Sequence, residues 1–164
     1  MKALILASFL ALTSATALAQ APAPLPAALL SAHKIFLSNA GADSGLFPEP
    51  FSGGPDRGYN QLYTALQASG KYQLVADPAQ ADVVLELQLT APSGPASPNK
   101  QLGAGDAVPM FRLVVYDAKS HFILWAFTQS VSVAILQKTH DRNFDDALNG
   151  ILLDFEGLTA KSKP

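Results

Sequence analysis

The chain has 164 residues, of which 49% are hydrophobic, and its formal net charge is −2. Its eleven Lys and Arg residues are scattered, so the chain has neither the basic stripe of a nucleic-acid binder nor a polybasic segment for anionic lipid. The absence of cysteine excludes disulfides, thiolate zinc sites, iron–sulfur clusters and a cysteine nucleophile. What remains is one mildly acidic domain with enough apolar residues for a core.

The first twenty residues have the three-part layout of a secretory signal peptide. Met1-Lys2 gives a positive start, residues 3–12 are apolar, and Ala17 and Ala19 are the small residues that a signal peptidase reads. We expect cleavage after Ala19 and export to the periplasm or the medium. The apolar run is shorter than the ~20 residues that span a bilayer, so we expect no membrane anchor after cleavage. Gln20 stands where a lipoprotein has its acylated cysteine.

The prolines at positions 22, 24 and 26 predict an extended lead-in over residues 20–33, before a single domain over 34–160 and a tail over 161–164. The short apolar run Lys34–Asn39 predicts the first strand. A loop rich in Gly, Pro and Ser follows, from Gly41 to Gly58. The next apolar residues recur at i, i+3, i+4 and i+7, which predicts a helix; they are Tyr59, Leu62, Tyr63 and Leu66.

That first helix has Asp56 as its candidate N-cap and Gly70 as its stop. Alternating or apolar runs then predict four more strands. These are Tyr72–Val75, Val83–Leu89, Phe111–Val115 and Phe122–Val133. The turn-like Asp117–Ser120 makes the last two strands an antiparallel hairpin. The segment Ala91–Pro109 has little to bury, so we expect it to be mobile.

Apolar residues between Phe144 and Phe155 trace one face of a closing helix, with Asp141 as its candidate N-cap. The order β-α-β-β-β-β-α predicts a two-layer α+β sandwich. Its sheet is expected to be mostly antiparallel, with about five strands and both helices on one face. The connection Asp77–Ala81 leaves two possibilities open, because a tight turn makes its flanking strands antiparallel and a helical crossover makes them parallel.

Three segments and the closing helix carry a family resemblance: Leu66–Val75, Ala81–Leu87 and Phe111–Asp117. This succession resembles the small amino-terminal α/β domain of the periplasmic Tol propeller protein. It is also similar to uncharacterised small exported bacterial α/β proteins. The resemblance implies a domain that makes protein contacts in the cell envelope, with no catalytic residues to carry over.

Residues capable of catalysis or metal binding are few. His33, His121 and His140 lack metal-ligand spacing, so we interpret them as exposed and expect no metal or cofactor. The adjacent Asp145 and Asp146 point about 100° apart on a helix, which is typical of a solvated face. Trp125 is predicted to share a strand face with Ile123 and Phe127, which indicates core packing, with exposure as a binding aromatic as the alternative.

The loop Gly41–Gly58 is the main candidate for binding. Its residues Leu46, Phe47 and Phe51, followed by Arg57, either fold back onto the core or form anchors for a partner protein. We therefore expect a non-catalytic exported accessory domain that binds an envelope protein through this loop or through a sheet edge. The alternatives are a small hydrolase with a histidine beside a carboxylate in a pocket, and a small-ligand carrier with an apolar cavity between helices and sheet. The oligomeric state stays open.

Overall fold

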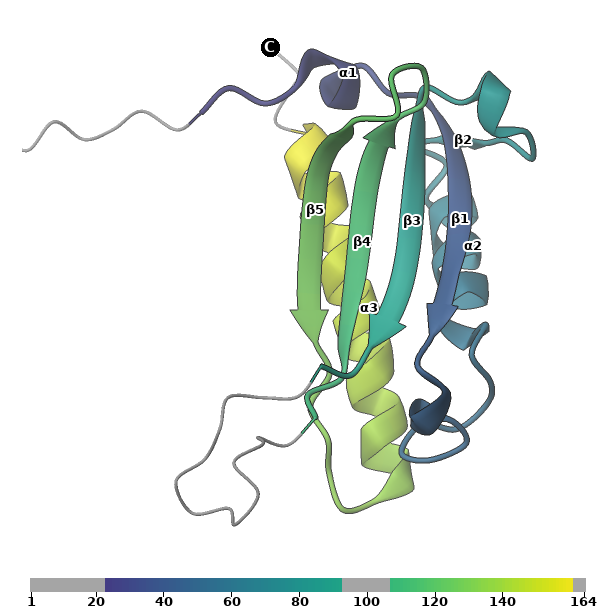
Figure 1. Cartoon of the computed structure of the whole chain (residues 1–164), viewed down its shortest axis with the longest axis vertical. Coiled ribbons are helices and arrows are strands. Elements are labelled where there is room, and N and C mark those ends of the chain that lie inside the picture. Colours follow the sequence, from purple (N-terminus) through teal and green to yellow (C-terminus); the bar gives the residue numbers. More distant parts are fainter. Residues whose placement is uncertain (1–22, 93–106, 161–164) are drawn as a thin grey trace, which may run out of the picture.

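A computed structural model describes residues 23–92 and 107–160. The predicted signal peptide, the central part of the segment Ala91–Pro109 and the predicted tail lie outside the described residues. The described chain forms one five-stranded sheet with two long helices on one of its faces (Figure 1). The predicted two-layer α+β sandwich is thereby confirmed.

The strands lie in the order β2-β1-β3-β4-β5. Their bounds are β1 Lys34–Ala42, β2 Gln73–Leu74, β3 Val83–Thr90, β4 Met110–Asp117 and β5 Ile123–Ser130. β1 pairs in parallel with both β2 and β3, whereas β3, β4 and β5 form an antiparallel meander. The sheet is consequently mixed, with its parallel part around β1.

The connection Asp77–Ala81 contains a short 3-10 turn, η2, over Pro78–Gln80. The Asp77 carboxylate accepts a hydrogen bond from the Ala79 backbone N–H at 2.9 Å, which fixes the start of this turn. The turn carries the chain across the end of β1, so β2 and β3 run in the same direction on opposite sides of that strand. The tight-turn alternative, which made these two strands antiparallel, is wrong.

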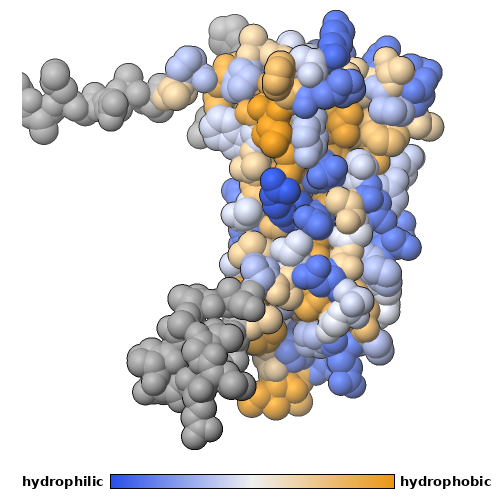
Figure 2. Space-filling model, in the orientation of Figure 1, coloured by the Kyte–Doolittle hydropathy of each residue, from blue (hydrophilic) through white to orange (hydrophobic). Residues whose placement is uncertain are grey.

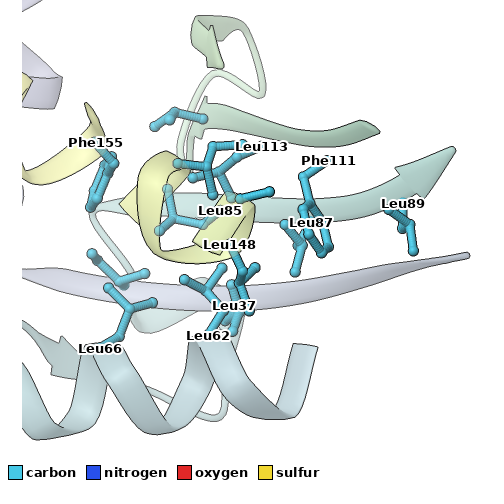
Figure 3. Packing of buried hydrophobic residues seen from close by; sticks show 14 of the residues in the cluster. Leu37, Leu62, Leu66, Leu85, Leu87, Leu89, Phe111, Leu113, Leu148 and Phe155 are labelled. Carbon is cyan, nitrogen blue, oxygen red and sulfur yellow. The ribbon is translucent and has the colours of Figure 1, made fainter. Parts of the chain in front are cut away.

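Both long helices cover one face of the sheet: α2 spans Arg57–Ser69 and α3 spans Gln137–Ala160. Their apolar stripes meet the inward side chains of β1, β3 and β4, as the labelled residues in Figure 3 show. Gly70 ends α2 in the left-handed conformation at φ 62°, as the sequence predicts. None of the helices in the described part of the chain lies over the opposite face of the sheet, and Figure 2 shows that face with polar residues across its middle.

Two helix boundaries differ from the expectations. The lead-in over residues 20–33 was expected to be extended, yet Ala27–Leu30 form a helical turn, α1, whose Leu29 is fully buried. α3 begins at Gln137, one turn before the predicted N-cap. Asp141 therefore lies inside the helix, where its side chain has a different role, described below.

Gly58, in the first turn of α2, lies close against the side chains of the sheet. A Cβ atom at this position would lie 3.0 Å from the Phe111 ring and 3.6 Å from Leu87. Since both of those side chains are buried, the space for a larger residue does not exist. The absence of a side chain at Gly58 therefore sets how closely α2 approaches β3 and β4.

We predict that Gly58→Leu lowers the free energy of unfolding by about 1–3 kcal/mol, because it overpacks this contact. The matched control is Gly157→Leu, also within a helix, where an added Cβ would meet no atom within 4 Å. The control should be neutral or more stable by up to ~1 kcal/mol, since glycine is a poor helix former. Urea unfolding of both variants checks this, and equal stabilities would contradict the packing argument.

Candidate functional site

Arg57, the first residue of α2, is the centre of a polar cluster between the two helices and the loop that precedes α2. Its guanidinium pairs with the Asp141 carboxylate at 2.5 Å and with the Asp145 carboxylate at 2.7 Å, both on α3. It also donates to the Ser52 carbonyl at 3.1 Å and lies 4.3 Å from the centre of the Phe144 ring. One side chain thus joins the loop, α2 and α3 through charge, hydrogen bonds and a cation–π contact.

The same cluster determines the state of Asp141. Burial alone would raise the pKa of this carboxyl. The hydrogen bonds from the Arg57 guanidinium and from Ser52, together with one from Gln137, outweigh burial and lower the pKa from 3.8 to about 2. Asp141 is therefore ionised under all ordinary conditions and acts as a fixed anion for the loop and for Arg57, not as a proton donor.

We predict that Asp141→Asn destabilises the fold by about 1.5–3 kcal/mol at neutral pH, the usual value for a hydrogen bond to a charged group. Because the folded pKa of Asp141 is depressed, its contribution is complete above the unfolded value near 3.8 and is lost as pH falls towards about 2. Unfolding curves of wild type and variant should accordingly converge over that interval. Asp146→Asn, at an exposed carboxylate that forms no ion pair within residues 23–92 and 107–160, is the control and should not change the pH profile. A constant gap between the wild-type and Asp141→Asn curves down to pH 2 would contradict the assignment.

The predicted partner-binding residues of the loop are brought together, but they fold inward. Leu46 and Phe51 are buried, and Phe47 is partly buried against the same core. The Phe51 ring centre lies 6.2 Å from that of Phe47 and 5.2 Å from that of Phe144. The fold-back alternative therefore describes this loop, and Arg57, the fourth candidate, clamps it in place.

The histidines differ from one another. His33 and His121 are exposed, as expected, whereas His140 is buried, contrary to the expectation. His140 packs edge-on against Phe51, and its Nδ1 accepts a hydrogen bond from the Ala134 backbone N–H at 3.2 Å. Within the described residues, no imidazole ring has a hydrogen bond to a carboxylate and no group of three potential ligands could hold a metal ion.

Asp145 also departs from its predicted role. It was interpreted as part of a solvated face, but it binds Arg57 and accepts a hydrogen bond from the Gln61 side chain at 3.0 Å. Its neighbour Asp146 is exposed as expected. The spacing of charges within one helix could not reveal Asp145 as a partner of α2, because that contact joins residues 84 and 88 positions apart.

A shallow groove of about 480 Å³ runs between α2 and α3 on the outer side of the helix layer. Its floor includes Leu62, Ala65 and Leu148, and Asp145 lies on its rim. The Gln61 Oε1 atom beside it is buried and has no hydrogen-bond partner. Between helices and sheet, the hollow beside Gly58 and Phe111 holds only about 10 Å³, which does not accommodate the apolar ligand of a carrier. A hollow of about 440 Å³ lies at the sheet edge, between Tyr59 and Tyr63 of α2 and Leu37 of β1.

A surface at the end of the sheet exposes three apolar side chains close together in the sequence. Ile135 is 99% exposed, Leu136 67% and Val133 58%, all in the segment that joins β5 to α3. We define the loop-end surface as these three residues together with Glu49 and Pro50 of the folded-back loop. A hollow of about 500 Å³ between Pro50, Ile135 and His140 brings the two segments together, and the Gln137 amide donates to the Pro50 carbonyl at 2.8 Å. Sequence reasoning missed this surface because it assigned Val133 to the preceding strand.

The comparisons with known proteins give the fold a context. No protein-family model matches the chain, and no curated protein does. Among solved structures, the chain is similar to a DUF4136 family protein from Bacteroides thetaiotaomicron, at 16% identity and a TM-score of 0.52, over 84% of this chain and 93% of that one. It is also similar to a DUF330 family-model protein from Xanthomonas campestris, at 14% identity and a TM-score of 0.45, over 80% and 85% of the two chains.

A third similar structure is a lipoprotein from Neisseria meningitidis, at 13% identity and a TM-score of 0.36, over 73% of this chain and 98% of that one. The chain therefore shares its fold with an uncharacterised bacterial protein, in agreement with the coarser part of the predicted resemblance. Among the described residues, none of the helices has the length and apolar character needed to cross a bilayer.

Proposed function

We propose that this chain is a non-catalytic accessory module of the bacterial cell envelope that binds another protein through the loop-end surface. The observation that carries the proposal is the exposure of Ile135, Leu136 and Val133 in a single short segment. Clustered apolar side chains on a domain surface are typical of protein-interaction sites, because exposing these side chains to water costs free energy until a partner covers them.

The rigid support beneath this surface strengthens the proposal. Phe51 and His140 are in edge-on ring contact below the hollow, and Gln137 binds the Pro50 carbonyl at its rim. Asp141, held by Arg57, accepts from the Ser52 backbone N–H at 3.0 Å. The apolar residues thus project from a fixed base, which reduces the ordering entropy that binding would otherwise cost.

The roles of the four loop residues change accordingly. Leu46, Phe47 and Phe51 position the surface from inside, and Arg57 fastens the loop to α3, so a partner would contact Pro50 and the segment 133–136 instead. The partner that fits is an envelope protein offering an apolar segment, because the most exposed residues here are uncharged aliphatics. Export to the periplasm or the medium, the likeness to the Tol amino-terminal domain and its envelope contacts belong to the same proposal.

Catalysis is not part of the proposal. The hydrolase hypothesis needs an imidazole in contact with a carboxylate, and the one buried imidazole, His140, binds a backbone N–H at Nδ1. Asp141 and Asp145, the two α3 carboxylates beside the loop, are both engaged by Arg57. A binding role is the function that this geometry supports best.

We predict that a photo-crosslinking residue placed at Ile135 captures a discrete protein in the envelope of the native host. The added substitution Leu136→Glu should reduce this capture roughly tenfold, because it puts a charge into an apolar contact. The control is a crosslinker at Leu153 on α3, an aliphatic side chain that is 66% exposed, and it should not capture the same protein. Equal capture from both positions, or capture unaffected by Leu136→Glu, would overturn the proposal.

A further inference from the structure

The strand β5 is an edge strand without the usual protection. Within residues 23–92 and 107–160, no strand pairs with its outer side, and it forms one border of the sheet in Figure 1. Between Lys119 and Lys138 the sequence contains no Asp, Glu, Lys, Arg or Pro. Charges, prolines, short length and bulges are features by which edge strands avoid pairing with another chain. β5 spans Ile123–Ser130 and has none of the first three, and its one bulge, at Leu124, lies before the regular stretch 125–130.

The other border of the sheet shows the contrast. β2 comprises only Gln73–Leu74, with Lys71 before it and Asp77-Pro78 after it. A strand of two residues offers few backbone groups to a partner, and the flanking charges and proline disfavour its extension. The sheet is thus protected against pairing with another chain at its β2 border but lacks charges and prolines at its β5 border.

The alternation of hydrogen bonds between β4 and β5 shows which backbone groups of β5 are free to pair with another strand. The Val131 N–H donates to the Pro109 carbonyl of the neighbouring chain segment at 2.7 Å. In an antiparallel pair, residues alternate between those that bond to the neighbouring strand and those that point away from it. Residues 125, 127 and 129 therefore bond to β4, and the N–H and C=O groups of Ala126, Thr128 and Ser130 point outward.

We propose that β5 pairs antiparallel with β5 of a second copy of this chain, joining two sheets into one. The pairing must match outward groups with outward groups, and we place its two-fold axis at Phe127, which does so within the regular stretch 125–129. Ala126 then lies opposite Thr128 of the second copy, and Phe127 lies opposite the same residue in a pair whose side chains are close.

The chemistry of the strand selects a second copy as the occupant. When a strand pairs with the same strand of a second copy about a two-fold axis, a charged side chain near the axis lies close to the identical side chain of the other copy. Like charges opposite each other are destabilising. β5 carries no charge, so it avoids this repulsion completely. The side chains next to the outward groups, Ala126 and Thr128, are small, and the partly buried Phe127 would close the seam between the two helix layers.

The first test is sedimentation velocity of the purified chain at micromolar concentrations. We expect a concentration-dependent dimer, and we expect Thr128→Pro to abolish it, because proline removes an outward N–H without removing a bond to β4. Thr128→Lys should raise the dimer dissociation constant roughly tenfold or more. Ser38→Lys is the matched control, since it adds the same charge on the open face opposite Glu86 on β3 and should leave the dimer intact.

A wild-type chain that stays monomeric overturns the proposal, as does a dimer that survives Thr128→Pro in a variant with native circular dichroism. The register is tested separately, because the chain contains no cysteine of its own. The double variant Ala126→Cys/Thr128→Cys should form a covalent dimer on oxidation, since directly paired Cα atoms lie about 5.5 Å apart. Ala126→Cys alone should not, because the diagonal separation of about 7–8 Å is too long for a disulfide. Cross-linking of the single variant as fast as the double one would refute this register.

Discussion

The position of Arg57 is the constraint on which the arrangement of the helices and of the loop depends. A cation in the first turn of a helix is opposed by the helix dipole. Here the two α3 carboxylates, Asp141 and Asp145, offset that cost and bring the start of α2 against the N-terminal part of α3. Because a planar guanidinium can bind two carboxylates and stack on an aromatic ring at once, lysine would not replace it. The loop before α2 is then held by the same groups, and Phe51 seals the core beneath it.

Local patterns in the sequence predicted the elements well, because each element carries its own periodicity. The alternation in β3 and the stripe of α3 are both signals of burial on one side, and both elements formed over the residues that carry these patterns. The failures concern signals that depend on distant partners. Asp141 has the residue type of an N-cap, but α3 starts earlier and the carboxylate serves Arg57, 84 residues away. His140 was expected on the surface because nothing nearby in sequence announces the Phe51 ring that covers it.

The sheet shows the same limit in another form. The alternation of β5 placed Ile123, Trp125 and Phe127 on one face. The pairing with β4 shifts, however, between Val115 and Tyr116, which leaves one extra residue in β5. Trp125 and Phe127 pack against the core, while Ile123 is largely exposed. A bulge is invisible to a period-two pattern. The candidate site could not be predicted from the sequence either, because the exposure of Ile135 depends on where β5 ends and where α3 begins.

The two proposed surfaces are compatible with each other, because they use different parts of the same segment. Edge pairing of β5 uses backbone groups only as far as Ser130, whereas the loop-end surface starts at Val133. An antiparallel two-fold pairing reverses the strand direction between copies, so the two loop-end surfaces would lie at opposite ends of the joined sheet. In such a dimer the two loop-end surfaces would be too far apart to bind the same site of one partner molecule. The dimer would instead be suited to bridging two partner molecules. Bridging raises the apparent affinity for partners that are themselves fixed in an assembly, without any new contact, since the second binding event becomes intramolecular. A module with modest individual contacts would in that way bind firmly only where its partners are arrayed.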